Sequence, residues 1–364
     1  MNIVRVESFV RDRFGLVRLT REDGAQGWGQ MAHGDPDVCA TLLHRYLAPV
    51  CLGHTCTGLA ELTQLLDACE FGPYKSRGTH LIRALAGIDS AGHDLLATAA
   101  GVPVCRLLGG EPMRLPVYAS SLKRDTRPAD EVDTMLRYCE QHGVSAVKLK
   151  VGHRLGRHRS EDAGRTEALI PLAAAAFGDR SLKVDANGSY TAEEAITVGR
   201  LLEQNGYDHY EEPCPYWRFD DTRAVTEALE IPVAGGEQDC CDAVLIHQVT
   251  AGCVDIIQPD VGYLGGLRRS LAVAAVAAQH DMPCMPHAPN PSLLFPMSMH
   301  LSCAMPNRGA YLERNANRPS FDIGMYTGLS PLVDGAVTVD DTPGWGVTIR
   351  DDWLSACQHQ QSQL

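Results

Sequence analysis

Three carboxylates lie at equal intervals along the chain, each at the end of an apolar run. Asp185, Glu211 and Glu237 follow one another at steps of 26 positions, about the length of one strand, one helix and two short loops. In a β/α barrel, residues one such repeat apart lie on neighbouring parallel strands and meet at their C-terminal ends. Carboxylates there repel one another unless a cation lies between them. The spacing therefore predicts a site for Mg²⁺, or alternatively Mn²⁺, because both favour oxygen ligands.

Two lysines, Lys148 and Lys150, end the apolar run that precedes this group. Because side chains alternate along a strand, both ammonium groups are expected to point into the barrel. Close to each other and to a metal, they would lower one another's pKa toward about 7 to 8, where a lysine acts as a base at neutral pH. Two alternatives stay open, namely solvated lysines in salt bridges and an aldolase that forms a Schiff base at Lys150.

Asp260 and His287 are 27 positions apart, again one repeat, so we expect them on adjacent strands within hydrogen-bonding reach. A carboxylate on one imidazole nitrogen raises the pKa of the ring and leaves the other nitrogen to give or take a proton. Taken singly, Asp260 could cap a helix and His287 could be a core histidine. Glu313, a further 26 positions on, could be a salt-bridge partner for Arg314, or, if it faces inward, a protonated acid that donates to an oxyanion. Asn187 would share the face of Asp185 and contact substrate.

Together these residues place a base on each side of a metal. That arrangement suits removal of a proton next to a carboxylate, because the metal binds the carboxylate oxygens and its charge stabilises the resulting enediolate. The acid on the opposite side then completes the reaction.

The elements that must position these residues fall into two groups. Up to residue 113, alternating strands at 4–10, 15–20 and 26–30 and helical patterns at 37–47, 59–69 and 79–100 predict an α+β unit. From residue 114, strands alternate with helices, which is typical of a barrel. The eight barrel strands are expected at 114–120, 145–151, 181–185, 207–211, 231–235, 254–258, 282–286 and 310–313.

The predicted organisation is an α/β barrel at 114–318, of the (β/α)8 or modified (β/α)7β type, with an α+β capping domain at 1–113. Residues 319–364 are expected to return to the cap, with strands at 335–339 and 346–349. Helices are expected at 191–205, opened by a capping box at Thr191, and at 266–279.

The composition describes a globular protein with a large core. Of 364 residues, 45% are hydrophobic and 21% are charged. The net charge of −13 disfavours nucleic acid as a partner. Neither a membrane span nor a signal peptide is expected. The 13 cysteines are scattered through apolar contexts, which indicates reduced, buried thiols and a cytoplasmic location.

Several motifs resemble the mandelate racemase subgroup of the enolase superfamily, and the likeness covers nearly the whole chain. They are Lys148-x-Lys150, Asp185-x-Asn187, Glu211-Glu212-Pro213, Gly236-Glu237, Asp260, His287 and the closing motif Pro343-Gly344-Trp345-Gly346-Val347. The resemblance implies Mg²⁺ bound by Asp185, Glu211 and Glu237. It also implies that relatives are usually multimers, so we expect a homo-oligomer.

The same resemblance assigns roles on either side of the metal. Lys150 would be the base on one face, with Lys148 adjusting its pKa and contacting the substrate carboxylate. The pair Asp260 and His287 would be the acid or base on the other face, and Glu313 would support the enediolate.

We therefore predict a Mg²⁺-dependent dehydratase of an acid sugar, either an aldonate or an aldarate. Lys150 would remove the C2 proton and His287 would help the 3-hydroxyl leave, giving a 2-keto-3-deoxy acid. A racemase, epimerase or cycloisomerase of a 2-hydroxy carboxylate would use the same enediolate, and a non-catalytic scaffold is the remaining alternative.

Two departures from the family bear on substrate recognition. The loop at residues 11–14 is shorter than the family's usual lid, so we expect closure by residues 31–35 or by 72–78. His33 in the first of these segments, and Tyr74 and Arg77 in the second, are expected to bind substrate. The stretch between Lys150 and the next strand is longer than the other repeats. It carries a basic insertion at 153–159, which could bind the far end of an extended or doubly anionic substrate or could simply be solvated.

Overall fold

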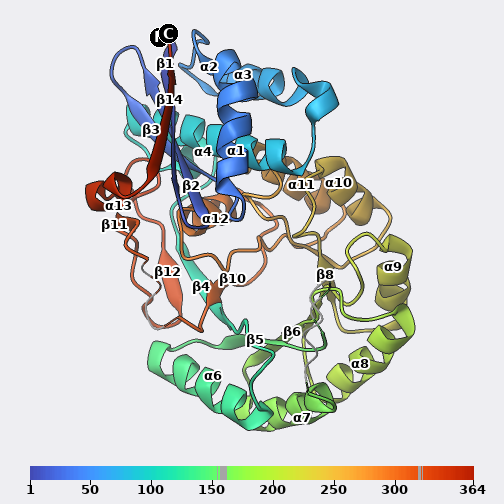
Figure 1. Cartoon of the computed structure of the whole chain (residues 1–364). Coiled ribbons are helices and arrows are strands. Elements are labelled where there is room, and N and C mark those ends of the chain that lie inside the picture. Colours follow the sequence, from blue (N-terminus) through green and yellow to red (C-terminus); the bar gives the residue numbers. More distant parts are fainter. Residues whose placement is uncertain (154, 156–161, 319–320, 322) are drawn as a thin grey trace.

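The protein consists of a capping domain and a barrel that lie side by side (Figure 1). The computed structural model describes residues 1–153, 155, 162–318, 321 and 323–364. No helix in these ranges is long and apolar enough to cross a membrane. All thirteen cysteines are free thiols, ten of them buried, as their apolar sequence contexts predicted.

The cap begins with the predicted antiparallel meander of β1 (Ile3–Arg11), β2 (Phe14–Arg21) and β3 (Gln26–Met31). Its other elements before the barrel are α1 (Pro36–Leu42), the π-helical turn η1 (Leu43–Leu47), α2 (Ala48–Cys51), α3 (Leu59–Phe71), the 3₁₀ turn η2 (Tyr74–Ser76), α4 (Thr79–Ala100) and α5 (Val104–Leu107). Helix α4 lies directly on β3, because Gly27 and Gly29 have no side chain to collide with its backbone.

Seven barrel strands lie in the order β10-β4-β5-β6-β7-β8-β9, each parallel to its neighbour. They are β4 (Arg114–Ser120), β5 (Ala146–Lys150), β6 (Ser181–Asp185), β7 (His209–Glu211), β8 (Val233–Gly235), β9 (Ile256–Ile257) and β10 (Leu312–Asn315). The strand predicted at 282–286 is reduced to single bridges from Cys284 to Ile257 and to Arg308. Pro283 and Pro286 lack backbone donors, so a longer ladder cannot form there.

Helices pack around the outside of these strands, and Figure 1 shows α6 to α11 as an arc. They are α6 (Pro128–His142), α7 (Arg165–Phe177), α8 (Ala192–Gln204), α9 (Phe219–Ala228), α10 (Asp242–Thr250), α11 (Leu267–Gln279) and α12 (Leu294–Ala304). The predicted capping box of α8 is present, since the Thr191 hydroxyl accepts from the Glu194 N–H and the Glu194 carboxylate accepts from the Thr191 N–H.

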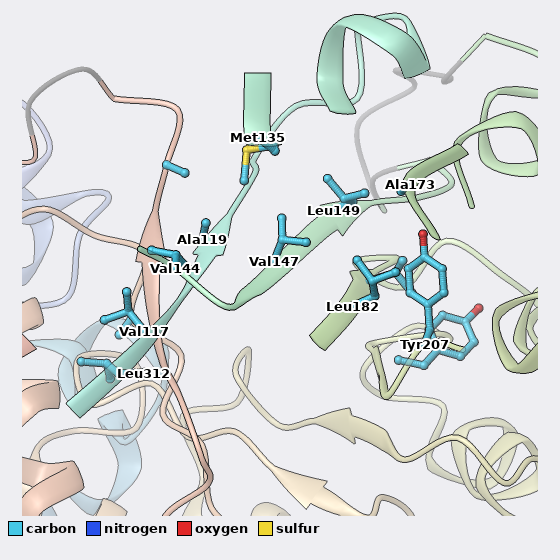
Figure 2. Packing of buried hydrophobic residues seen from close by; sticks show 14 of the residues in the cluster. Val117, Ala119, Met135, Val144, Val147, Leu149, Ala173, Leu182, Tyr207 and Leu312 are labelled. Carbon is cyan, nitrogen blue, oxygen red and sulfur yellow. The ribbon is translucent and has the colours of Figure 1, made fainter. Parts of the chain in front are cut away.

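The alternation of β5 divides its side chains between two environments. Val147 and Leu149 belong to the hydrophobic cluster between strands and helices, together with Met135 of α6 and Ala173 of α7 (Figure 2). The intervening Lys148 and Lys150 therefore point to the barrel interior, as the period-two pattern predicted.

The C-terminal segment pairs differently from the prediction. Strand β12 (Ala336–Thr338) joins β4 of the barrel rather than the cap, and β13 (Thr348–Ile349) pairs with β11 (Tyr326–Thr327). After α13 (Asp351–Ser355), β14 (Gln358–Gln363) adds to the free edge of β1, so the C-terminal segment does rejoin the cap. The expected return of 335–339 to the cap was wrong, because a short apolar alternation does not specify its partner strand.

A buried cluster of charges joins the cap to the barrel. Helix α11 begins after Gly266, which has no capping side chain, and its first N–H groups are bound by Asp89 of α4 instead. Asp89 accepts from Leu267 N at 2.7 Å and from Arg268 N at 3.3 Å. Alongside, Arg269 is fully buried and pairs with Glu70 of α3. An acidic group from the cap thus caps a barrel helix.

We expect the substitution Asp89→Ala to lower the free energy of unfolding by about 1–2 kcal/mol, because two helix N–H groups lose their acceptor. Asp89→Asn keeps an acceptor oxygen and should cost less. Urea denaturation of the two variants checks this, and equal losses would show that the carboxylate's contact with α11 does not matter.

Candidate active site

A cavity of about 550 Å³ lies where the cap covers the C-terminal ends of the barrel strands. The barrel side of its wall includes Lys150, Asn187, Glu237 and His287. These four residues come from the ends of four different strand repeats, so the equal spacing along the chain does bring them to one rim. The cap contributes residues from the β1–β2 turn and from the segment after β3.

Lys148 is fully buried between two carboxylates. Its Nζ lies 2.7 Å from both oxygens of Glu211 and 3.0 Å from Glu313 Oε1. Burial alone would lower the pKa of Lys148, but Glu211 and Glu313 outweigh it and raise that pKa well above its usual range. The expectation of a lowered pKa was therefore wrong for Lys148, since carboxylates rather than the second lysine surround it.

Lys150 lies beside Asp185, its partner in the β5–β6 register. Its Nζ is hydrogen-bonded to Asp185 Oδ2 and lies 3.1 Å from Asn187 Oδ1. Asn187 has a positive φ of 46° and donates its own N–H to Asp185 Oδ1 at 2.7 Å. The pattern Asp185-x-Asn187 thus folds into a tight turn that fixes the orientation of the Asp185 carboxylate.

The three predicted metal ligands lie in the expected places on the sheet but do not form a preassembled cluster. Asp185 and Glu211 are cross-strand partners, and Glu237 follows β8. Among the described residues, no three His, Cys, Asp or Glu side chains are arranged to hold one ion. Each carboxylate is instead turned to a nearby donor, Asp185 to Lys150, Glu211 to Lys148 and Glu237 to Gln238, which is how buried anions avoid mutual repulsion.

The donor set nevertheless fits a hard divalent cation. All the candidate ligand atoms are carboxylate oxygens. One of them, Glu237 Oε2, is buried without a hydrogen-bond donor, as is Oε1 of the nearby Glu212. Burial and the carboxylates of Asp185 and Glu211 raise the pKa of Glu212 to about 7. Burial and Glu212 raise the pKa of Glu237 well above its usual range. A bound cation would reduce the repulsion among these buried carboxylates.

His287 and Asp260 form the predicted pair. His287 Nδ1 lies 2.7 Å from Asp260 Oδ2, while its Nε2 faces the cavity, 3.6 Å from Glu237 Oε2. Asp260 is held in turn by the N–H groups of Gly262 and Tyr263. Burial opposes the charged imidazole, but Glu237 and the hydrogen bond that His287 donates to Asp260 outweigh it and raise the pKa of His287 to about 10.

Glu313 departs from its predicted protonation state. Burial would favour the neutral acid, yet Lys148 and His287 lower the pKa of Glu313 below its usual range. Its Oε2 accepts from Ala288 N at 3.1 Å. Glu313 is therefore an ionised partner of Lys148, and the expected protonated donor was the wrong interpretation, because its spacing alone did not reveal the lysine beside it.

His33 reaches the cavity from the cap and contacts a residue that the sequence reasoning missed. Its Nδ1 lies 3.1 Å from the hydroxyl of Tyr263. The guanidinium of Arg83 lies over the Tyr263 ring, 4.4 Å from the ring centroid. Burial lowers the pKa of His33 to about 4, although Asp260 opposes this. Tyr263 follows Asp260 by three positions. This closeness to a predicted site residue could have identified Tyr263 as a candidate for the cavity wall.

Tyr74 and Arg77 do not lie on the cavity wall. Tyr74 is 70% exposed. Arg77 pairs with Glu70 at 2.7 Å and belongs to the charge cluster that joins cap and barrel. The loop at 72–78 is therefore not the cavity's cover, and local sequence could not reveal this because Glu70 and Arg77 meet only in the folded cap. Of the basic insertion, Arg154, Arg157, His158 and Arg159 lie outside the described residues.

The short loop that was discounted as a lid does line the cavity. Arg11, Asp12, Arg13 and Phe14 all contribute to its wall, as does Arg124, which follows β4. Arg124 donates to Asn187 Oδ1 at 2.8 Å and to Gly152 O at 3.2 Å. Hairpin length alone was a poor guide, because even this short turn reaches the cavity at the barrel mouth.

Comparison with known proteins agrees with this geometry. Residues 3–109 match the family described as mandelate racemase / muconate lactonizing enzyme, N-terminal domain, and residues 130–353 match the enolase C-terminal domain-like family. The chain belongs to the mandelate racemase/muconate lactonizing enzyme family. The resemblance to the enolase superfamily is thereby confirmed, as is the fold of a capping domain with a (β/α)7β barrel.

The relatives of this family member carry several activities in their names. An arabinonate dehydratase from Saccharolobus solfataricus is 26% identical, with 92% of this chain and 88% of the relative aligned. A D-galactarolactone cycloisomerase from Agrobacterium fabrum is 29% identical, with 95% and 92% aligned.

Two solved structures extend the comparison. A presumed racemase from Roseobacter denitrificans is 42% identical over the full length of both chains, with a TM-score of 0.96. A mandelate racemase/muconate lactonizing protein from Paracoccus denitrificans, complexed with magnesium, is 26% identical, with a TM-score of 0.89 and 100% and 98% of the chains covered.

The lowered pKa of His33 has a measurable consequence in this family member. The imidazole should titrate with a midpoint of about 4 in the folded protein, whereas an unfolded histidine titrates near about 6.5. As pH falls from 6.5 to 4 the unfolded state binds a proton that the folded state does not, so this residue's contribution to stability declines with acid. Histidine NMR signals assigned with His33→Gln check this; a midpoint near 6.5 would contradict it.

Proposed function

We propose that this family member is a Mg²⁺-dependent dehydratase of an acid sugar, converting an aldonate or aldarate to a 2-keto-3-deoxy acid. The observation that carries the proposal is that Lys150 and His287, from opposite sides of the barrel, face one cavity together with the carboxylate of Glu237. The name of the arabinonate dehydratase supports the same reaction class.

Asp185, Glu211 and Glu237 are the residues that would hold the metal, and the undonated oxygen of Glu237 supports this assignment. A magnesium complex of the Paracoccus relative supports the choice of ion. When bound, Mg²⁺ supplies positive charge that stabilises the oxygens of an enediolate. Lys148, held between Glu211 and Glu313, keeps part of the surrounding negative charge balanced.

The two proton transfers are assigned to residues on different sides of the cavity. Lys150 Nζ, oriented by Asn187 and Asp185, takes the proton from C2 of the substrate. His287 holds its Nδ1 against Asp260 and presents Nε2 to the cavity, so it gives a proton to the departing 3-hydroxyl. His33 of the cap and Tyr263 of the barrel meet in the wall of this cavity, where the cap covers the strand ends.

An isomerase is the second candidate, and specific observations favour it. The presumed racemase from Roseobacter is 42% identical, and the Agrobacterium relative is named as a cycloisomerase. Racemisation or epimerisation would use Lys150 and His287 as the two bases on either face of the same enediolate. A non-catalytic scaffold has less support, because every position predicted to hold a catalytic base or a metal ligand carries a residue that can serve in that role.

Separate substitutions of the two bases test the division of labour. Lys150→Met should lower keto-acid formation by at least about 100-fold and abolish exchange of the C2 proton with D₂O. His287→Asn should lower keto-acid formation similarly yet retain C2 exchange, since Lys150 is intact. Semicarbazide assay and ¹H NMR over an acid-sugar library measure both. Racemised substrate without any keto acid would replace the dehydratase by the isomerase.

Replacing one proposed ligand tests whether these carboxylates bind Mg²⁺. Glu237→Gln should weaken Mg²⁺ binding at least about tenfold in isothermal titration calorimetry, because one of the anionic ligands becomes a neutral amide. Glu230→Gln is the matched control, since Glu230 is exposed and remote from the cavity. Equal affinities for both variants, or no binding by the unmodified protein, would remove Glu237 from the metal site.

A cytoplasmic location and a homo-oligomeric assembly remain predictions. Size-exclusion chromatography with light scattering gives the assembly state directly.

A further inference from the structure

We propose that the cap side of the cavity binds a second anionic group of the substrate, remote from the carboxylate that takes part in the reaction. The substrate class is then a doubly anionic acid sugar, either an aldarate or a phosphorylated aldonate, rather than a simple aldonate. This inference rests on the proposed function for the reacting end and adds a distal subsite to it.

The β1–β2 turn fixes the position of this subsite. β1 ends at Arg11 and β2 begins at Phe14, so only Asp12 and Arg13 form the turn. Asp12 has a φ of 55°, in the left-handed region that a tight hairpin turn requires. The carbonyl of Arg13 accepts from Gly34 N at 3.2 Å, which joins the tip to the segment that carries His33. Backbone contacts therefore hold Arg13 at the cavity wall.

Arg11 is oriented by the C-terminal segment. Its guanidinium lies 6.0 Å from the ring centroid of Trp353, a buried residue of α13, and its Nε lies 3.7 Å from Asp12 Oδ2. Cation–π contact and ion pairing together restrict this long side chain. Arg11 thus neutralises Asp12, which is one of only two carboxylates that the described residues contribute to the cavity wall.

Arg13 is left with its charge unbalanced. It forms no ion pair with any carboxylate in the described part of the chain, and the other carboxylate of the wall, Glu237, belongs to the reacting end. Arg124 differs, because its guanidinium already donates to Asn187 and Gly152 and so serves the loop around it. The distal wall therefore carries a net positive charge in a protein whose overall charge is −13.

The guanidinium group of Arg13 indicates which ligand groups this subsite would bind. Guanidinium groups bind carboxylate or phosphate through paired N–H donors, and they do so best where the site is partly shielded from water. A cavity of about 550 Å³ is in the usual range for a small-molecule site. Because Lys150 and Arg13 both line this cavity, we expect a chain with an anion at each end to present one anion to the reacting groups and the other to Arg13.

The experiment compares substrates that differ only at the distal end. Galactarate and D-galactonate share one carbon skeleton, with a carboxylate or a hydroxymethyl group at C6; glucarate, D-gluconate and 6-phosphogluconate form the second set. We expect kcat/KM to be at least tenfold higher for a dianion than for its monoanion. Arg13→Gln should lower kcat/KM for the dianion about tenfold or more, chiefly through KM, so that the preference collapses.

The matched control is Arg45→Gln, which removes the same charge from an exposed residue of the cap outside the cavity. Its dianion-to-monoanion ratio should equal that of the unmodified protein. A preference for 6-phosphogluconate over glucarate assigns the subsite to phosphate, and the reverse assigns it to carboxylate. Equal kcat/KM for dianions and monoanions, or an equal effect of Arg13→Gln on both, overturns the subsite while leaving the dehydratase in place.

Failure of the proposed function gives a different result. If no acid sugar yields a keto acid, the subsite is tested by binding, as the shift in Tm that galactarate and D-galactonate produce in the presence of Mg²⁺. A larger shift with galactarate that Arg13→Gln removes supports the distal anion site. Equal shifts with the two ligands, or no shift with either, overturn it.

Discussion

The balance of buried charge inside the barrel is the constraint on which the site depends. Lys148 has almost no contact with water and is paired with Glu211 and Glu313. Removing one partner of such a buried pair typically costs about 3–5 kcal/mol, because the remaining charge is left unpaired. The lysine and the carboxylates are therefore mutually required, and a chain that keeps one must keep the others. Binding of a cation adds to this balance rather than creating it.

The same balance fixes the register of the strands. In β5 the apolar Val147 and Leu149 face the helices while the lysines face inward, and Lys150, Asp185 and Glu211 are consecutive cross-strand partners. A slip of one residue would bury the lysines among helices and expose the carboxylates to apolar side chains. Packing and electrostatics thus favour a single alignment, and that alignment is the one that presents Lys150 to the cavity.

A second set of buried charges sets the cap on the barrel. Asp89 caps α11, and Glu70 binds Arg269 and Arg77. Further along the same helix α4, Asp94 accepts from the N–H groups of Trp28 and Trp345, and the Trp345 indole donates to Trp28 O. The closing motif therefore binds the meander. Both sets of contacts restrict the position of the cap relative to the barrel.

The sequence predicted what local repeats control and failed where distant segments meet. The 26-residue interval revealed the barrel and the pairing of Asp260 with His287, because each repeat is a self-contained strand and helix. It could not reveal that Glu313 is ionised, that Arg77 binds Glu70, or that 335–339 pairs with β4 of the barrel rather than with the cap. Those facts depend on side chains or strands that come together only after folding, and the sequence contains no periodic signal for them.

The catalytic residues of the barrel and the arginine of the cap differ in how tightly they are tied to other charges. Residues that touch the reacting end, such as Lys150 and His287, are tied to other buried charges, so a change at any of them disturbs several partners. Arg13 is held by its backbone carbonyl, and its side chain has no ion-pair partner in the described part of the chain. Replacing that side chain therefore alters the charge of the wall without unpairing a buried group. Under the proposed distal subsite, a change in the hairpin turn would therefore alter which substrate is accepted while the reacting groups stay the same.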